Sequence, residues 1–255
     1  MSAAGAWDMS GRVVLVTGAG KGLGRGAALR LAAAGAQVLL VSRTFADLEA
    51  CAAEIEAAGG AAEALVADVT DPGEVAAAVR RAEALGELRG CVCGAGTNVT
   101  GPAVDYSLED WDRLFAINVR ATFATARAVG ASILARGAEG SIVTLSSQMG
   151  TVGFPGRVAY CSTKHAVEGM TKALAVEWAA QRVRVNAVAP TFVDTPMTRP
   201  MFEDEEFRAE VFARLPTRRL ATVEEVAEAV AYLASDASGS VTGHVLRVDG
   251  GWTAW

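Results

Sequence analysis

The sequence is poor in the residues that build metal sites and disulfide frameworks. It holds two histidines and four cysteines in 255 residues, and no two cysteines form a Cys-x-x-Cys pair. A zinc site made of histidine and cysteine ligands therefore has little to build from. A disulfide framework is not expected in a chain of this length, so we expect a reducing cytoplasmic setting.

Long apolar runs and an excess of one charge are also missing. The apolar stretches are short and broken by glycine or charged residues, so no membrane span is predicted. The stretch from Met1 to Gly11 lacks a basic region followed by an apolar one, which indicates no signal peptide. The 23 basic and 29 acidic residues give a net charge of −6 without a long run of one sign, so no nucleic-acid surface is expected.

What the sequence does contain is a large apolar fraction arranged in alternating strand and helix patterns. Hydrophobic residues make up 51% and charged residues 20% of the chain, which suits one sizeable buried core. The strand candidates are apolar on both faces, as in a covered parallel sheet. They are Val13–Thr17, Val38–Ser42, Ala64–Val69, Cys91–Cys93, Ser141–Ser146, Val183–Ala189 and Val245–Val248.

Amphipathic helices are predicted between these strands. The candidates are Gly22–Ala34, Phe45–Ala58, a helix starting at Asp71-Pro72, Leu108–Ala135, Arg157–Ala180 and a helix starting at Thr222. The repeated βαβ pattern predicts an α/β fold, a Rossmann-type doubly wound sheet of seven parallel strands with helices on both faces. No linker, low-complexity tract or repeat is evident, so residues 1–255 are expected to form a single domain.

One segment, residues 195–216, interrupts the alternation. It has two prolines near its start and the acidic run Glu203-Asp204-Glu205-Glu206, and it is longer than a simple connection. It is either a surface helical insertion or a substrate lid over a site. The acidic run itself is most simply a solvated helix face.

A glycine-rich loop follows the first strand and precedes a helix. It reads Thr17-Gly18-Ala19-Gly20-Lys21-Gly22-Leu23-Gly24. Glycines let a pyrophosphate approach the backbone, and the helix N-terminus supplies N–H groups. The spacing is neither Gly-x-Gly-x-x-Gly, because position 23 is leucine, nor a Walker A loop, because Lys21 is not followed by serine or threonine. A dinucleotide site is favoured over a plain turn.

The tip of the second strand indicates which dinucleotide binds. In such folds an acidic residue there binds the ribose of NAD, and a basic one accommodates the 2′-phosphate of NADP. Here Ser42 and Arg43 stand at the tip, while Asp47 comes later inside the next helix. With Lys21 as a second cation, the pattern favours NADP(H), and NAD(H) stays possible.

The pair Tyr160 and Lys164 carries the candidate chemistry. Residues four apart on a helix share one face, and a cationic neighbour lowers the pKa of a phenol. A tyrosine tuned in this way could exchange a proton with a carbonyl or alcohol oxygen near neutral pH. Ser147 lies thirteen residues upstream of Tyr160.

Together these motifs resemble the short-chain dehydrogenase/reductase family over essentially the whole chain. Seven motifs appear in the family's order and spacing. They are the glycine loop, Asp68-Val69 at the end of the third strand, Asn118, Ser147, Tyr160 with Lys164, Arg184-Val185-Asn186 and Asp249-Gly250-Gly251. The chain looks most like the carbonyl and L-xylulose reductase subgroup, with gluconate 5-dehydrogenase and glucose dehydrogenase types as near relatives in pattern.

The chain departs from the family pattern in two places. The family's Asn-Asn-Ala-Gly appears as Cys93-Gly94-Ala95-Gly96, which affects local rigidity more than chemistry. The family's Pro-Gly is Pro190-Thr191, and threonine there resembles the carbonyl reductase subgroup.

The resemblance implies a hydride transfer between a nicotinamide and a carbonyl carbon. Tyr160 would donate or accept the proton, Lys164 would lower its pKa and hold the nicotinamide ribose, and Ser147 would bind the substrate oxygen. Asn118 would hold a water that links Lys164 to solvent. The resemblance also implies cofactor contacts from the following residues: Gly18, Gly20, Lys21, Gly22, Leu23, Gly24, Ser42, Arg43, Asp68, Val69, Ala95, Gly96, Tyr160, Lys164, Pro190, Val193 and Thr195.

Neighbouring residues receive plainer roles. Ser146 is expected to point away from Ser147, His165 to face another side of its helix, and Cys161 to fill space. Gln148, Met149 and Phe154 line either the substrate pocket or the core.

Three functions are weighed from these residues. The first is an NADP(H)-dependent reductase or alcohol dehydrogenase acting on a sugar, polyol or small ketone. The second is a 3-oxoacyl-[acyl-carrier-protein] reductase, which needs a basic docking surface near the site; Ala138 and Gln181 stand about where that family has arginines, and Arg136 and Arg182 are close in sequence. The third is a non-catalytic cofactor-binding sensor or scaffold. The resemblance also implies a homotetramer or homodimer, in which the apolar tail 251–255 would be buried.

Overall fold

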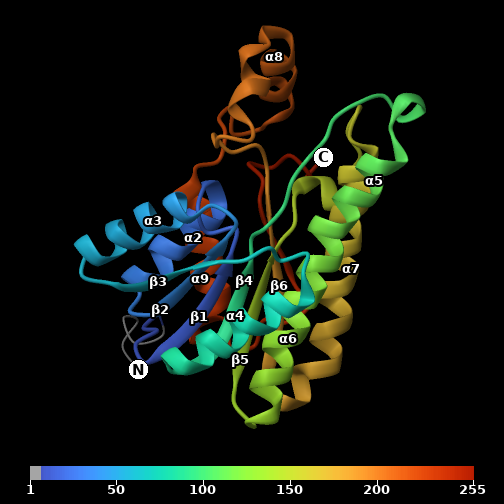
Figure 1. Ribbon diagram of the computed structural model, residues 1–255. Coiled ribbons are helices and arrows are strands. Elements are labelled where there is room, and N and C mark those ends of the chain that lie inside the picture. Colours follow the sequence, from blue (N-terminus) through green and yellow to red (C-terminus); the bar gives the residue numbers. More distant parts are fainter. Residues whose placement is uncertain (1–6) are drawn as a thin grey trace.

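Seven parallel strands form the sheet that organises the molecule (Figure 1). They run β1 Arg12–Thr17, β2 Gln37–Ser42, β3 Ala61–Val66, β4 Glu87–Cys93, β5 Gly140–Leu145, β6 Val183–Pro190 and β7 Val245–Val248. Their order is β3-β2-β1-β4-β5-β6-β7, and every neighbouring pair is parallel. The order reverses between β1 and β4, which confirms the doubly wound Rossmann-type prediction.

The computed structural model describes residues 7–255, in which helices cover both faces of the sheet. These are α2 Gly22–Ala33, α3 Phe45–Ala57, α4 Pro72–Leu85, α5 Leu108–Phe115, α6 Ala121–Ala135, α7 Val158–Trp178, α8 Glu205–Arg214 and α9 Val223–Ala234. Figure 1 shows α2 and α3 on one side of the sheet and α5, α6 and α7 on the other, with α8 standing apart above the strand ends. The stretch Met1 to Gly11, in which no signal peptide was expected, begins with residues 1–6, which lie outside the described residues.

Short turns complete the chain. They are the 3₁₀ turns Ala103–Asp105, Gln148–Gly150, Ala179–Gln181, Arg199–Glu203 and Asp236–Ser238, and one π-helical turn, Ala116–Arg120. Within residues 7–255, no helix combines the length and apolar character needed to cross a membrane.

The core forms two layers because strand side chains alternate between the faces of the sheet. Val14 and Val16 of β1 pack with the layer that contains α2 and α9. Val13 and Leu15 of the same strand pack with the layer that contains α4, α6 and α7. All four side chains are at most 2% exposed, which is why the strand reads as an unbroken apolar run.

Helix starts follow the capping signals in the sequence. Asp71 precedes α4, with Pro72 as its first residue, and its carboxylate accepts hydrogen bonds from the N–H groups of Gly73 and Glu74. Thr222 and Glu225 form the predicted capping box at the start of α9. Both starts are therefore set by local side-chain chemistry.

Three predicted elements are clearly wrong in their bounds. The fourth strand was expected over Cys91–Cys93, but it begins at Glu87. The third strand was expected over Ala64–Val69, but it ends at Val66. Asp68 lies in the following loop, because its carboxylate accepts hydrogen bonds from the backbone N–H and hydroxyl of Thr70 and so forms a turn. The predicted helix Leu108–Ala135 is divided by the π-helical turn Ala116–Arg120 into α5 and α6.

The carboxyl ends of β1 and β4 approach each other closely at Gly94. A Cβ atom on Gly94 would lie 2.6 Å from the Thr17 carbonyl oxygen and 3.4 Å from the Gly24 Cα. The Thr17 hydroxyl accepts hydrogen bonds from the N–H groups of Gly94 and Ala95, at 3.1 and 3.3 Å. Thr17 thus braces the edge where the family has asparagine side chains.

This contact predicts that Gly94→Ala lowers the free energy of unfolding by about 1–3 kcal/mol, because backbone atoms must move to admit the methyl group. Denaturant unfolding followed by tryptophan fluorescence would measure it. Gly153→Ala is the matched control, since nothing lies within 4 Å of its added Cβ. It should change stability by no more than about 0.5 kcal/mol. Equal stability of the two variants would contradict the packing described.

Candidate active site

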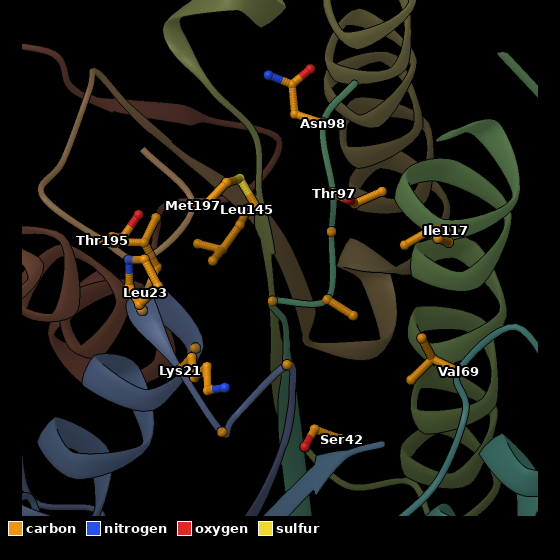
Figure 2. A pocket seen from close by; sticks show the side chains of 18 of the residues that line it. Lys21, Leu23, Ser42, Val69, Thr97, Asn98, Ile117, Leu145, Thr195 and Met197 are labelled. Atoms are coloured by element: carbon orange, nitrogen blue, oxygen red, sulfur yellow. The ribbon is translucent and has the colours of Figure 1, made fainter. Parts of the chain in front are cut away.

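A cavity of about 700 Å³ opens at the carboxyl ends of β1, β2, β4, β5 and β6. Loops after parallel strands meet at this edge of the sheet. Figure 2 shows Leu23 and Thr195 on one side of the cavity, with Thr97 and Asn98 opposite. Every residue predicted to contact the cofactor lines the cavity: Gly18, Gly20, Lys21, Gly22, Leu23, Gly24, Ser42, Arg43, Asp68, Val69, Ala95, Gly96, Tyr160, Lys164, Pro190, Val193 and Thr195.

The glycine loop is packed too closely for side chains. A Cβ atom on Gly24 would lie 2.2 Å from the Gly18 carbonyl oxygen, and one on Gly18 would lie 2.8 Å from the Gly94 backbone. Gly22, the first residue of α2, has φ +55°, a conformation that favours glycine. The bare backbone and the N-terminus of α2 therefore face the cavity, and they fit the pyrophosphate of a dinucleotide.

The two cations expected to meet a 2′-phosphate are Arg43 at the tip of β2 and Lys21 in the glycine loop, and they differ in their partners. Lys21 pairs with Asp47 at 3.0 Å, so its charge is partly compensated. Arg43 is exposed on the cavity rim and takes part in no ion pair among residues 7–255. Hydrogen bonds from Thr70 and the charge of Arg43 lower the pKa of Asp68. Arg43 is thus the cation best placed to meet a phosphate.

Tyr160, Lys164 and Ser147 come together at the inner end of the cavity. The Lys164 ammonium donates a hydrogen bond to the Leu145 carbonyl at 2.7 Å and lies 5.4 Å from the centre of the Tyr160 ring. Ser147 lies two residues after the end of β5, and its hydroxyl accepts a hydrogen bond from Met149 N–H at 3.2 Å. The helix α7 and the end of β5 therefore bring the three predicted side chains into one site.

The pKa of Tyr160 differs from the sequence prediction. Burial raises it to about 12, although a hydrogen bond with Ser147 and the charge of Arg157 both lower it. Burial also lowers the pKa of Lys164 to about 8. Burial thus acts against the charged form of both groups, and it opposes the lowering of the Tyr160 pKa that was expected from a cationic neighbour. At neutral pH Tyr160 is a neutral phenol beside a charged ammonium.

Asn118 stands behind the cavity wall and does not line it. Its side chain accepts from Thr97 N–H at 2.9 Å and donates to the Thr97 carbonyl at 2.9 Å and the Thr163 hydroxyl at 3.2 Å. It lies in the π-helical turn, where its own carbonyl accepts from Thr122. Asn118 therefore fixes the strand-end segment that passes in front of Lys164.

The neighbours of these residues have structural contacts. Ser146 donates to the buried Glu168 carboxylate at 2.9 Å, as expected of a side chain that points away from Ser147. His165 is exposed and contacts the Cys161 carbonyl of its own helix. Met149 and Phe154 belong to an apolar cluster with Phe192, which favours the core alternative for both.

Several cavity residues were not predicted from the sequence. They are Thr97, Asn98 and Val99 after β4, Ile117, Leu145, and the stretch Pro196, Met197 and Thr198. The signal that could have found the first three is topological, because every loop that leaves a strand at this edge faces the site. Thr191 also lines the cavity and is one of the two departures from the family pattern.

The segment 195–216 is largely helical, as expected of a surface helical insertion, which was one of the two alternatives for it. It contains the turn Arg199–Glu203 and α8, which Asp204 caps by accepting from Glu206 and Phe207 N–H groups. Phe207 packs edge-on against Phe192 at 5.6 Å between ring centres. Its first residues, Thr195 to Thr198, line the cavity.

Known proteins share both this sequence and this fold. The family model described as Enoyl-(Acyl carrier protein) reductase matches residues 18–253. The L-xylulose reductase of Homo sapiens is 38% identical over 246 residues, which cover 96% of this chain and 98% of that protein.

Two solved structures superpose on almost the whole chain. A gluconate 5-dehydrogenase from Beutenbergia cavernae, described as putative and NAD(P)-dependent and solved with bound NADP at low occupancy, is 42% identical with a TM-score of 0.93. It covers 98% of this chain and 100% of that one. A gluconate 5-dehydrogenase from Burkholderia cenocepacia, solved with NADP and tartrate, is 33% identical with a TM-score of 0.94 and 99% coverage of both chains.

Burial of Lys164 predicts a pH dependence of stability. Its pKa is about 8 in the folded chain, against 10.5 when exposed, so between these values the unfolded state binds the additional proton. Stability contributed by this group is therefore complete above about 10.5 and is lost as the pH falls through about 8. Relative to Lys164→Met, the wild-type free energy of unfolding should rise by about 2 kcal/mol from about pH 7.5 to 9.5. Parallel curves in chemical denaturation would contradict it.

Proposed function

Because the chain belongs to the short-chain dehydrogenase/reductase family, we propose that it interconverts a carbonyl and a secondary alcohol of a sugar or polyol with NADP(H). It is an NAD(P)-dependent enzyme that acts on CH–OH groups. The observation that carries the proposal is the meeting of Tyr160, Lys164 and Ser147 at the inner end of a cavity that all the expected cofactor residues line. The names of its relatives, which refer to L-xylulose and gluconate, support a polyhydroxylated substrate.

Tyr160 is the proposed acid and base. As a neutral phenol at neutral pH it can donate a proton to a carbonyl oxygen, and as a phenolate it can accept one from an alcohol. The Ser147 hydroxyl would bind the same oxygen and stabilise charge that develops on it. The nicotinamide, when bound, supplies or accepts the hydride.

Lys164 and Asn118 have supporting roles in this proposal. Lys164 would hold the nicotinamide ribose and present a positive charge to the phenol at pH values below about 8. Asn118 would support resupply of protons to Lys164 through a water, and its contacts with Thr97 and Thr163 keep that segment in place. Ser147, Tyr160 and Lys164 act on the substrate or cofactor, whereas Asn118 acts through them.

The acyl-carrier-protein alternative is less well supported by the surface. Docking of an acidic carrier needs free cations, and the two arginines considered for it have partners within the chain. Arg182 pairs with Glu139, and Arg136 donates hydrogen bonds to the carbonyls of Ser132 and Leu88. The family and enzyme class likewise favour catalysis over a sensor or scaffold.

Other features of the proposal concern assembly and access. Exposed apolar side chains on α6 and α7, Phe123 at 41% and Val176 at 83%, support a homotetramer or homodimer built on these helices. Within the tail 251–255, Trp252 is buried in its own chain, whereas Trp255 is 82% exposed and would be covered in such an assembly. We also propose that residues 195–216 act as the substrate lid.

Replacing the proposed acid tests the mechanism. Tyr160→Phe should lower kcat for NADPH-dependent carbonyl reduction by about 10²–10⁴-fold, because the proton donor is lost. NADPH affinity, measured by fluorescence titration, should change little. Tyr232→Phe is the matched control, since Tyr232 lies on α9 against Trp7. Turnover of Tyr160→Phe equal to that of the control would refute the role.

Reversing the charge at the rim tests the cofactor preference. Arg43→Asp should weaken NADPH binding by about 10–100-fold and NADH binding much less, because only NADPH carries the 2′-phosphate. Arg80→Asp on the exposed face of α4 makes the same change in net charge and should leave the ratio unaltered. An unchanged NADPH to NADH ratio in Arg43→Asp would remove the basis for NADP preference.

A further inference from the structure

Glu168 is a buried acidic residue that the proposed mechanism does not use. It lies on α7, one helical turn after Lys164, and is 6% exposed. Within residues 7–255, no ion pair includes it. Its carboxylate accepts a hydrogen bond from the Ser146 hydroxyl at 2.9 Å. Burial disfavours a carboxylate without a cationic partner, so its place beside the site indicates a role beyond filling space.

The same carboxylate lies against Gly150, on the other side of Ser147 in the sequence. A Cβ atom on Gly150 would lie 2.3 Å from Glu168 Oε1 and 2.6 Å from the Ser146 hydroxyl oxygen. Both distances are too short for a real contact, so a side chain at position 150 would push against the pair formed by Glu168 and Ser146. Glu168 therefore meets the chain directly before Ser147 and again three residues after it.

The turn between these two contacts orients the Ser147 hydroxyl. Residues Gln148–Gly150 form a buried 3₁₀ turn, in which the Gly150 N–H donates to the Ser147 carbonyl at 2.8 Å. The Met149 N–H donates to the Ser147 hydroxyl oxygen at 3.2 Å. A serine hydroxyl has one proton and two lone pairs, so this bond leaves the proton free for Tyr160 or a substrate oxygen. The position of the turn thus decides where that proton points.

Other contacts hold the chain on one side of Ser147 at a time. Before it, the Ser146 N–H donates to the Val188 carbonyl at 2.8 Å, as part of the sheet edge. After it, the Thr151 hydroxyl accepts from the Arg247 side chain at 3.0 Å, at an exposed position. The Glu168 side chain is buried and reaches both sides, so it fixes the turn relative to the strand end.

We propose that Glu168 is a positioning residue for the reaction. By holding Ser146 and the backbone at Gly150, its carboxylate keeps the turn in place and so directs the Ser147 hydroxyl toward the oxygen that Tyr160 protonates. The proposal rests on the proposed function, in which Ser147 binds that oxygen. Of the described residues that line the cavity, Glu168 is not one, so its effect on the reaction passes through Ser147.

Amide hydrogen exchange tests the positioning without any substrate. In Glu168→Ala the amides of Met149 and Gly150 should exchange about tenfold or more faster than in the wild type, because the turn loses its support. Glu168→Gln keeps an acceptor oxygen and should stay within about threefold of the wild type. Glu177→Ala, at an exposed position of the same helix, is the matched control and should leave these rates unchanged. The amide of Leu15, in the core of β1, reports global stability.

Unchanged exchange at Met149 and Gly150 in Glu168→Ala would overturn the proposal. If the Leu15 amide accelerates equally, Ser146→Ala gives the same test with a smaller change, because it removes only the donor hydroxyl. Protection of the turn in Ser146→Ala equal to that in the wild type would then overturn the proposal.

Kinetic coupling to Ser147 separates positioning from a general effect on the structure. With L-xylulose and NADPH, Glu168→Ala should lower kcat by about 10–100-fold, while NADPH affinity stays within about twofold. In a Ser147→Ala background the same change should lower kcat by less than about threefold, because the hydroxyl that Glu168 positions is already absent. Losses that multiply in the double variant would overturn the role of Glu168.

Failure of the proposed function gives a different result. A wild-type protein that turns over neither L-xylulose with NADPH nor D-gluconate with NADP⁺ would count against the proposed function. The exchange rates at Met149 and Gly150 would still decide whether Glu168 holds the turn.

Discussion

The site depends on two side-chain hydrogen bonds that tie α7 to the end of β5. Lys164 donates to the Leu145 carbonyl at 2.7 Å, and Ser146 donates to Glu168 at 2.9 Å. Lys164 and Glu168 are one helical turn apart, and they bind the consecutive residues Leu145 and Ser146. The next residue, Ser147, therefore lies on the same side of the site as Tyr160. Position 150 is glycine, and a Cβ atom there would lie 2.3 Å from the Glu168 carboxylate, so a larger residue would displace the side chain that Ser146 binds.

The two ends of the cavity are built on different principles. At the cofactor end the chain offers backbone: the glycine loop, the start of α2 and the bare edge at Gly94, where close approach excludes side chains. At the other end it offers polar side chains without hydrogen-bond partners among residues 7–255, such as Asn98 and Thr191, which line the cavity. The first arrangement fits the pyrophosphate that such dinucleotides share. The second selects a substrate by what it can satisfy.

The departures from the family pattern have physical counterparts. Gly94 occupies an asparagine position; β1 and β4 meet closely there, and the Thr17 hydroxyl accepts hydrogen bonds from the N–H groups of Gly94 and Ala95. Thr191 occupies a glycine position and adds a hydroxyl without a partner beside the substrate end of the cavity. The loss of the asparagine side chain at Gly94 is compensated by the Thr17 hydroxyl, whereas the Thr191 hydroxyl adds a polar group to the cavity.

The sequence by itself determined the sheet, the helix starts and the identity of most site residues. Apolar runs such as Val13–Thr17, the caps at Asp71 and Thr222, and the spacing of Tyr160 and Lys164 are local signals. Only the tertiary structure decided the end of β3, the π-helical turn at Asn118, the raised pKa of Tyr160 and the hydrogen bond between Ser146 and Glu168. These depend on burial and on residues distant in sequence, because desolvation and hydrogen-bond satisfaction are set by everything that surrounds a group rather than by its neighbours along the chain.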